Sequence, residues 1–168
     1  RLAKRTSAVI ALSEKQKSEL SDDYRICAHD KIRVIPLGFD LSRFTVDQEQ
    51  KRKEFRSQYF LSDDQLAVGI VGRLVPVKNH AMFLEAARQL LDRDPDRLRF
   101  FLIGDGESRA DLIRQCESTG IDHVFFPDTA ANAAVTFTGW RRDVDRVMAG
   151  LDIVALTSWN EGTPVSLI

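Results

Sequence analysis

The fold is decided by residues 66–79, whose sequence is LAVGIVGRLVPVKN. The first six residues are apolar and Gly72 follows them, so they predict a buried β-strand that ends at this glycine. The basic residues Arg73 and Lys78 come next, and Asn79 opens a stretch with helical periodicity. A buried strand that is followed by a loop and a helix predicts one βα unit of a parallel sheet.

The same alternation continues along the chain and predicts a Rossmann-like α/β domain, a parallel sheet with helices on both faces. Further strands are predicted at residues 99–103, 134–138 and 151–156, and helices at residues 79–92, 108–118 and 143–149. The side chains expected inside the helices are Phe83, Ala86, Ala87, Leu90 and Leu91 in the first, and Leu112, Ile113 and Cys116 in the second. Residues 123–133 do not fit the alternation, because Pro127 interrupts the apolar residues 124–126, and we expect a surface loop there.

The N-terminal residues predict two short strands, at residues 7–12 and 31–35, which are too few to make a domain alone. Between them, Ser13 and Gln16 form a capping-box pattern, which predicts a short helix that ends near Tyr24.

Proline and glycine after the second strand mark a linker. We therefore expect residues 1–36 to be the end of a preceding domain, residues 37–47 to be the linker, and residues 48–168 to be a second domain. This domain begins with a charged surface helix around residues 47–59 and is truncated at its C-terminal end.

The last stretch, residues 161–168, predicts a loop that carries Glu161 and a helix that begins at Pro164. A natural domain rarely ends one turn into a helix, so we expect the chain to be a piece of a longer protein.

Composition excludes several classes of function. The chain has 168 residues, 43% of them hydrophobic, and a net charge of −1, so it lacks the basic footprint of a nucleic-acid-binding protein. No apolar run reaches the roughly 20 residues that span a bilayer.

We interpret the two cysteines, Cys27 and Cys116, as reduced packing residues of a cytosolic protein. We interpret the three histidines, His29, His80 and His123, as surface or packing residues.

The residues that carry chemistry follow the predicted strands. Because parallel strands end at one edge of the sheet, which we call the rim, Arg73, Lys78 and Glu161 should meet there. Arg73 can bind a phosphate through two donors and Lys78 as a point charge, while the start of the following helix adds partial positive charge. We favour a diphosphate site over the alternative of a solvated arginine and lysine.

Other motifs fail on inspection. Gly104 and Gly106 form a turn after the second strand of the domain, but Arg109 stands where a dinucleotide fingerprint needs its third glycine. The phosphate-loop pattern and the Ser/His/Asp and Cys/His sets of nucleophilic catalysis are absent from the sequence. We interpret Trp140 and Trp159 as packing residues rather than partner contacts.

Residues 72–80 and 161–168 together resemble the family-4 (group 1) retaining glycosyltransferases of the GT-B fold. The resemblance covers nearly the whole chain and implies two Rossmann-like domains that face each other across a cleft. The N-terminal domain would hold the acceptor, and the C-terminal domain, which residues 48–168 represent, would hold a nucleotide-diphosphate-sugar donor.

The resemblance also implies roles for individual residues. Arg73 and Lys78 would bind the donor diphosphate, and Glu161 would face the donor sugar. Backbone contacts to the donor are implied at Gly72, Gly162, Thr163, Pro164 and Val165, and contacts to the nucleotide base at Gly139, Trp140 and Arg141. The resemblance implies no cofactor and no divalent metal. It implies an acceptor that is a sugar, a lipid-linked sugar or a small molecule, bound by the preceding domain.

The expected function is transfer of a sugar to an acceptor hydroxyl with retention of anomeric configuration, in polysaccharide or glycoconjugate synthesis. We expect a cytoplasmic protein, with the inner face of the membrane as an alternative location through its preceding domain. The alternatives are a sugar-nucleotide epimerase of the same fold and a donor-binding fragment without turnover. Two departures from the family are expected: the second glutamate of the paired-glutamate motif, expected directly after Ile168, is not present, and the acceptor domain is nearly all missing. Residues 123–133 also form a longer excursion than the family usually has.

Overall fold

The computed structural model describes residues 3, 5–127, 132–161 and 164–168. The chain divides into two compact units, Arg1–Leu41 and Ser42–Ile168, and the division lies within the predicted linker. That the first unit belongs to a preceding acceptor domain stays a prediction. Among the described residues, no helix has the length and the apolar character that crossing a membrane requires.

The first unit contains two short parallel strands, β1 (Val9–Ala11) and β2 (Ile32–Val34). Between them lie α1 (Glu14–Ser18), the π-helical turn η2 (Glu19–Asp23) and the 3-10 turn η3 (His29–Lys31). The predicted N-cap at Ser13 is confirmed, while the Gln16 side chain bonds the backbone one residue before the position that a full capping box uses. The Gln16 backbone N–H donates to Ser13 Oγ at 3.1 Å, and the Gln16 side chain accepts from the Leu12 backbone N–H at 2.6 Å.

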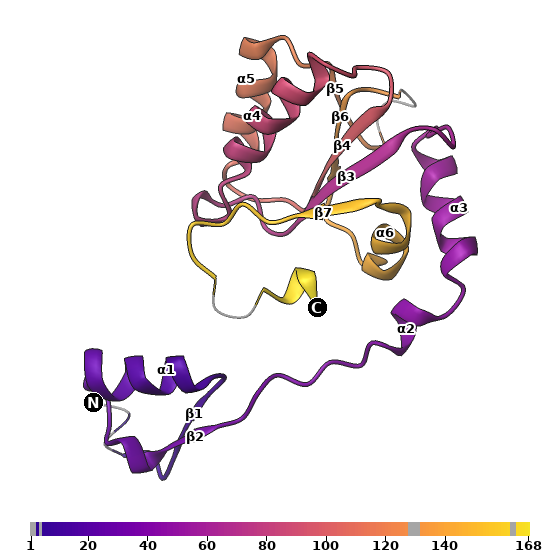
Figure 1. Cartoon of the computed structure of the whole chain (residues 1–168). Helices are drawn as coiled ribbons and strands as arrows, with labels where there is room; N and C mark the ends of the chain where they lie inside the picture. The colour runs from indigo at the N-terminus through magenta and orange to yellow at the C-terminus, as the bar shows by residue number, and fades with distance from the viewer. Residues whose placement is uncertain (1–2, 4, 128–131, 162–163) are drawn as a thin grey trace. The chain divides into compact units, whose positions relative to one another are not determined.

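The second unit is built on a five-stranded parallel sheet in the order β5-β6-β4-β3-β7 (Figure 1). The strands are β3 (Leu66–Val71), β4 (Leu98–Ile103), β5 (His123–Phe125), β6 (Val135–Gly139) and β7 (Ile153–Ala155). The helices are α2 (Ser42–Thr45), α3 (Gln48–Gln58), α4 (His80–Leu91), α5 (Arg109–Thr119) and α6 (Val144–Gly150), with 3-10 turns η4 (Pro76–Lys78) and η5 (Val165–Leu167). The predicted Rossmann-like architecture is confirmed.

Helices cover both faces of this sheet. Helices α4 and α5 lie on one face and α3 and α6 on the other (Figure 1). Each face has its own apolar cluster, one with Phe83, Phe100 and Leu112, and the other with Phe55 and Phe101. Burial of these clusters supplies the main favourable term in the stability of the domain.

The prediction of a surface loop at residues 123–133 is wrong at its beginning. Residues 123–125 form the edge strand β5, which pairs with β6 in parallel register, His123 opposite Val135. The Phe125 ring stacks on Phe137 with 5.2 Å between ring centroids, so aromatic packing across the pair holds this short strand despite the following Pro127. Residues 128–131 lie outside the described part of the chain.

The predicted inner face of α4 is wrong at two positions. Ala86 and Leu90 are exposed, while His80 and Leu84 are buried beside Phe83 and Ala87. The observed face follows the i, i+3, i+4, i+7 spacing from residue 80, so the apolar stripe is rotated from the one we predicted.

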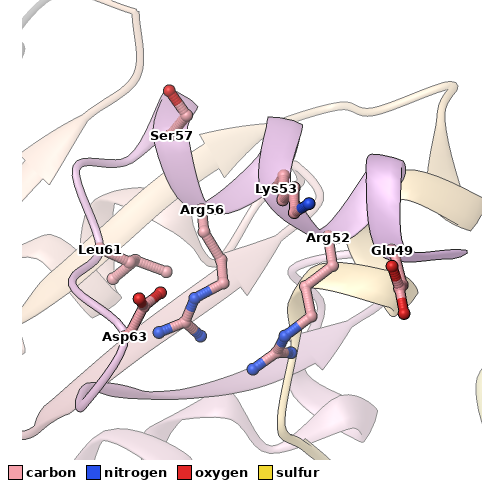
Figure 2. Close-up of a pocket in the computed structure, with 7 residues that line it drawn as sticks. All are labelled: Glu49, Arg52, Lys53, Arg56, Ser57, Leu61 and Asp63. Carbon is pink, nitrogen blue, oxygen red and sulfur yellow. The ribbon is translucent and has the colours of Figure 1, made fainter.

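Helix α3 is fixed to the sheet by a carboxylate at the edge opposite the rim. Asp152, directly before β7, accepts hydrogen bonds from Arg52 at 2.6 Å, from Arg56 at 3.2 Å and from the Ala67 backbone N–H at 2.7 Å. Arg52 and Arg56 extend side by side from the helix along a pocket whose wall also includes Lys53 (Figure 2). The two guanidinium groups therefore serve the packing of α3.

Candidate functional site

The strand order places a topological switch point between β3 and β7. From β3 the chain proceeds through β4 to β6 on one side, and then returns through α6 to β7 on the other side of β3. In open α/β sheets, the crevice outside the carboxyl ends of the strands at such a point is where ligands bind. The loop after β3, residues 72–79, and the segment after β7, residues 156–161, both lie at this edge of the sheet.

The loop after β3 packs backbone to backbone against the turn after β4. A Cβ atom on Gly104 would lie 2.0 Å from Gly72 O, and one on Gly106 would lie 2.4 Å from Leu74 O. Both distances are too short for any side chain, so these two glycines are needed for the close approach of the two loops. We call this contact the glycine seam; it fixes the loop that carries Arg73.

A second set of contacts joins this loop to the segment after β7. Thr157 Oγ1 donates to the carbonyl oxygens of Lys78 and Asn79, at 3.1 and 2.9 Å. The Trp159 backbone N–H donates to Val77 O at 2.9 Å. The two segments, about 80 residues apart in the sequence, are thus held together at the switch point.

Lys78 and Glu161 meet in an ion pair at this junction. Lys78 Nζ donates to Glu161 Oε1, and Ser158 Oγ donates to the same oxygen at 2.6 Å. The hydrogen bond from Lys78, followed by that from Ser158, holds the pKa of the Glu161 carboxyl below its usual value. The carboxylate therefore stays charged and remains paired with the ammonium group of Lys78.

Arg73 is exposed at the end of β3. In the part of the chain that the structure describes, its guanidinium makes no hydrogen bond or ion pair. The side chain of Lys78 passes over Gly72, since a Cβ atom there would lie 3.8 Å from Lys78 Cε. Arg73 and Lys78 therefore project from one short loop, and one of the two cations is open to an anionic ligand.

The rim at the end of β6 carries Gly139, Trp140 and Arg141. Gly139 has a positive φ of 67°, and Trp140 is 69% exposed. The Arg141 side chain is directed into the protein, where it donates to both oxygens of Asp143, at 2.8 and 2.6 Å, and to Tyr59 Oη at 3.0 Å. A base contact in this region would therefore use Trp140 and backbone atoms, and it stays a prediction.

The interpretation of both tryptophans as packing residues is wrong. Trp140 is 69% and Trp159 is 77% exposed, because each lies in a loop at a strand end rather than on an element that faces the core.

The predicted site residues at the end of the chain are only partly described. Gly162 and Thr163 lie outside the described residues. Pro164 precedes the 3-10 turn η5, so the predicted helix start is observed as a single tight turn, and Val165 is exposed.

Sequence reasoning did not single out Thr157, Ser158 or the closeness of His80 to the site. The hydroxyl groups of Thr157 and Ser158 had no motif to mark them, although a Ser or Thr shortly before a loop carboxylate is a usable signal.

His80 begins α4 and is buried, as the packing interpretation allowed. Burial, and then the charge of Lys78, lower the pKa of His80 to about 4, so the imidazole is neutral at physiological pH.

The fold is a Rossmann-like α/β domain that brings Lys78 and Glu161 together at the switch point of its sheet. The sequence comparison gives the family: residues 65–168 match the group 1 glycosyl transferases, and the chain belongs to this family.

Named relatives agree with this assignment. The chain is 28% identical over 158 residues to the UDP-Gal:alpha-D-GlcNAc-diphosphoundecaprenol alpha-1,3-galactosyltransferase of Escherichia coli, a match that covers 88% of this chain and 38% of the relative. It is 31% identical over 140 residues to the D-inositol 3-phosphate glycosyltransferase of Nocardia farcinica, covering 79% of this chain and 28% of that enzyme. The chain thus spans well under half the length of these relatives.

Solved structures share the fold. Anabaena Alr3699/HepE in complex with UDP and glucose superimposes with a TM-score of 0.71 at 26% identity, covering 94% of this chain and 39% of that protein. The glycosyltransferase WaaG superimposes with a TM-score of 0.76 at 19% identity over 94% of this chain and 40% of WaaG, which shows the GT-B architecture.

Proposed function

We propose that this chain is the donor-binding part of a glycosyltransferase that moves a sugar from a nucleotide-diphosphate-sugar to an acceptor hydroxyl. The observation that carries the proposal is the meeting of Lys78 and Glu161 at the switch point, with Arg73 on the same loop. Two cations beside one carboxylate suit a diphosphate that is attached to a hydroxyl-rich ring.

The relatives support the chemical class of donor. The Escherichia coli relative is named for a UDP-Gal donor, and Alr3699/HepE has been solved with UDP and with UDP-glucose. We propose a uridine or related nucleoside diphosphate donor, and a role in polysaccharide or glycoconjugate synthesis. We place the reaction in the cytoplasm, with membrane contact, if any, made through the acceptor domain.

The chemistry follows from charge. The donor loses a nucleoside diphosphate while positive charge develops on the sugar ring. A cation ~4 Å from the leaving phosphate, at an effective dielectric of ~20, contributes about 4 kcal/mol before desolvation costs. Arg73 and Lys78 would supply this stabilisation, and preorganised charge of this kind is commonly the largest catalytic effect.

Glu161 would orient the sugar and stabilise the cationic ring. Its pairing with Lys78 implies an exchange, in which the diphosphate takes Lys78 and the carboxylate turns to the sugar. We propose that transfer retains the anomeric configuration and requires no divalent metal. An epimerase would need a matched acid and base on the rim, whereas the carboxylate held at the switch point, Glu161, is paired with Lys78.

The test is a transfer assay on the full-length protein with UDP-glucose and UDP-galactose, run in the presence of EDTA. Arg73→Ala and Lys78→Ala should each lower transfer by more than 100-fold, since each loss of about 3 kcal/mol corresponds to that factor. Arg88→Ala is the matched control, because Arg88 is a partly exposed cation of α4 that pairs with Glu85 and Asp92.

Circular dichroism and thermal unfolding should show unchanged folding in the three variants. Near-normal turnover of Arg73→Ala and Lys78→Ala would remove the diphosphate assignment. Formation of an epimerised donor without any acceptor would replace transfer by isomerisation.

A further inference from the structure

The segment after β7 is fixed in place, yet its largest side chain is unburied. The hydrogen bonds of Thr157 and of the Trp159 backbone tie this segment to residues 77–79, and Ser158 is bonded to Glu161. The Trp159 side chain is nevertheless 77% exposed, the highest value among the large apolar side chains that the structure describes. These hydrogen bonds fix the backbone of Trp159, so the exposed indole extends from a defined position.

The position of Trp159 relative to the site is also defined. It stands two residues before Glu161, and its backbone contacts Val77, the neighbour of Lys78. A ligand held by Lys78 and Glu161 would therefore lie close to the backbone that carries the indole. Tryptophan combines a large apolar face with a negative π-surface, which suits the C–H groups on one face of a pyranose ring.

The second exposed tryptophan lies farther along the same rim. Trp140 follows β6 and Trp159 follows β7, and the strands β4 and β3 separate them in the sheet. Three strand spacings of ~4.8 Å place the two strand ends roughly 14 Å apart. The loop with Arg73 and Lys78 lies between them, a span that an extended nucleoside-diphosphate sugar can bridge.

We propose that Trp159 is a platform for the pyranose ring of the donor and thereby contributes to sugar selection. Trp140 would then serve the nucleotide end of the ligand. This inference rests on the proposed function, because it takes the diphosphate to lie at Arg73 and Lys78. The chemistry, an indole against the C–H face of a sugar, would also suit the acceptor, and the experiment distinguishes the two sources.

The test is calorimetric titration of the full-length protein with UDP, UDP-glucose and UDP-galactose. Trp159→Ala should weaken binding of the preferred UDP-sugar at least tenfold and leave the affinity for UDP within twofold. Trp159→Phe should recover part of the loss, because a smaller aromatic face remains. Leu90→Ala removes an exposed apolar side chain from the last turn of α4, at the end of the helix opposite the rim, and it is the control that should change neither affinity.

Each other result overturns the inference. An equal loss for UDP and UDP-sugar would move Trp159 to the base, and no loss for either would leave it without a donor role. Unchanged donor binding together with a raised KM for the acceptor would assign the indole to the acceptor sugar. A lowered melting temperature with an unchanged affinity ratio would make it a packing residue. Failure of the wild-type protein to bind UDP or either sugar would instead refute the proposed function itself.

Discussion

At the scale of single residues, the ion pair between Lys78 and Glu161 is the feature with the clearest chemical consequence. An ammonium group that is expected to hold a diphosphate is already bonded to a carboxylate. Under the proposed function, the donor has to displace an internal anion before it gains this cation. Binding of the nucleotide and release of Glu161 toward the sugar would then be a single coupled event.

This coupling predicts opposite effects of Glu161→Gln on binding and on turnover. Removing the negative charge frees Lys78 and ends repulsion of the diphosphate, so UDP should bind about fivefold more tightly, the equivalent of about 1 kcal/mol for a partly exposed pair. Transfer should fall at least 100-fold, because the sugar loses its carboxylate. Calorimetry with UDP and a transfer assay measure the two effects.

Ser158→Ala is the matched comparison, because it removes the second hydrogen bond to Glu161 and keeps the charge. It should leave UDP affinity nearly unchanged. A loss of UDP affinity in Glu161→Gln would contradict the displacement described here.

At the scale of elements, a carboxylate on α6 joins three helices. Asp145 accepts from Arg43 of α2 and forms an ion pair with Lys51 of α3 at 3.0 Å. The hydrogen bond from Arg43 is the main cause that lowers the pKa of Asp145 to about 2. The contact therefore anchors the short helix α2 to the domain.

This pKa gives the pH dependence of stability its sign. The folded protein has a lower pKa at Asp145 than the unfolded chain, so the stabilisation is fully present above the unfolded value near pH 4 and is lost as pH falls toward 2. Asp145→Asn should lower the melting temperature at pH 7 by on the order of 3 °C and have little effect at pH 2. Differential scanning calorimetry at pH 7 and pH 2 measures the two melting temperatures. An equal decrease at both pH values would contradict an ionic origin of the stabilisation by Asp145.

The glycine seam is the element contact that positions the loop of Arg73. Gly106→Ala would bring a methyl group against the backbone of Leu74, and the two loops would have to separate. We expect a loss of stability of about 1–3 kcal/mol, as for overpacking, and a weaker affinity for UDP because the loop moves. Gly38→Ala is the control, since nothing lies within 4 Å of its Cβ position.

Denaturant unfolding and UDP titration measure the two effects of Gly106→Ala. Unchanged UDP affinity in a destabilised variant would separate the seam from the site.

At the scale of the whole molecule, the alternation of apolar runs and helical periods was enough to predict the parallel sheet, because both periods are local properties of the sequence. The fold rule that strands end at one edge then brought Lys78 and Glu161 together. Long-range packing was not predictable in this way. The edge strand β5 depends on the stacking of Phe125 on Phe137, and the inner face of α4 depends on which stripe the sheet covers.

The exposure of the two tryptophans escaped prediction for a related reason. Composition favours burial of indole rings, and only the loops at the ends of β6 and β7 decide that Trp140 and Trp159 point to solvent. The pairing of Lys78 with Glu161 rather than with solvent also needed the hydrogen bonds of residues 157–159 to be seen. The roles of Arg73, Lys78 and Glu161 in binding remain predictions for the experiments above.

The glycine seam has a consequence for how such a protein can diversify. Because two backbones touch there, neither Gly104 nor Gly106 can be replaced by a residue with a side chain without disturbing the loop that carries Arg73. Trp140 and Trp159 have no such restriction, because both side chains are largely exposed and make few packing contacts. Natural variants with new sugar preferences should therefore accumulate changes at the two tryptophan positions, while the glycines of the seam between them tolerate almost none.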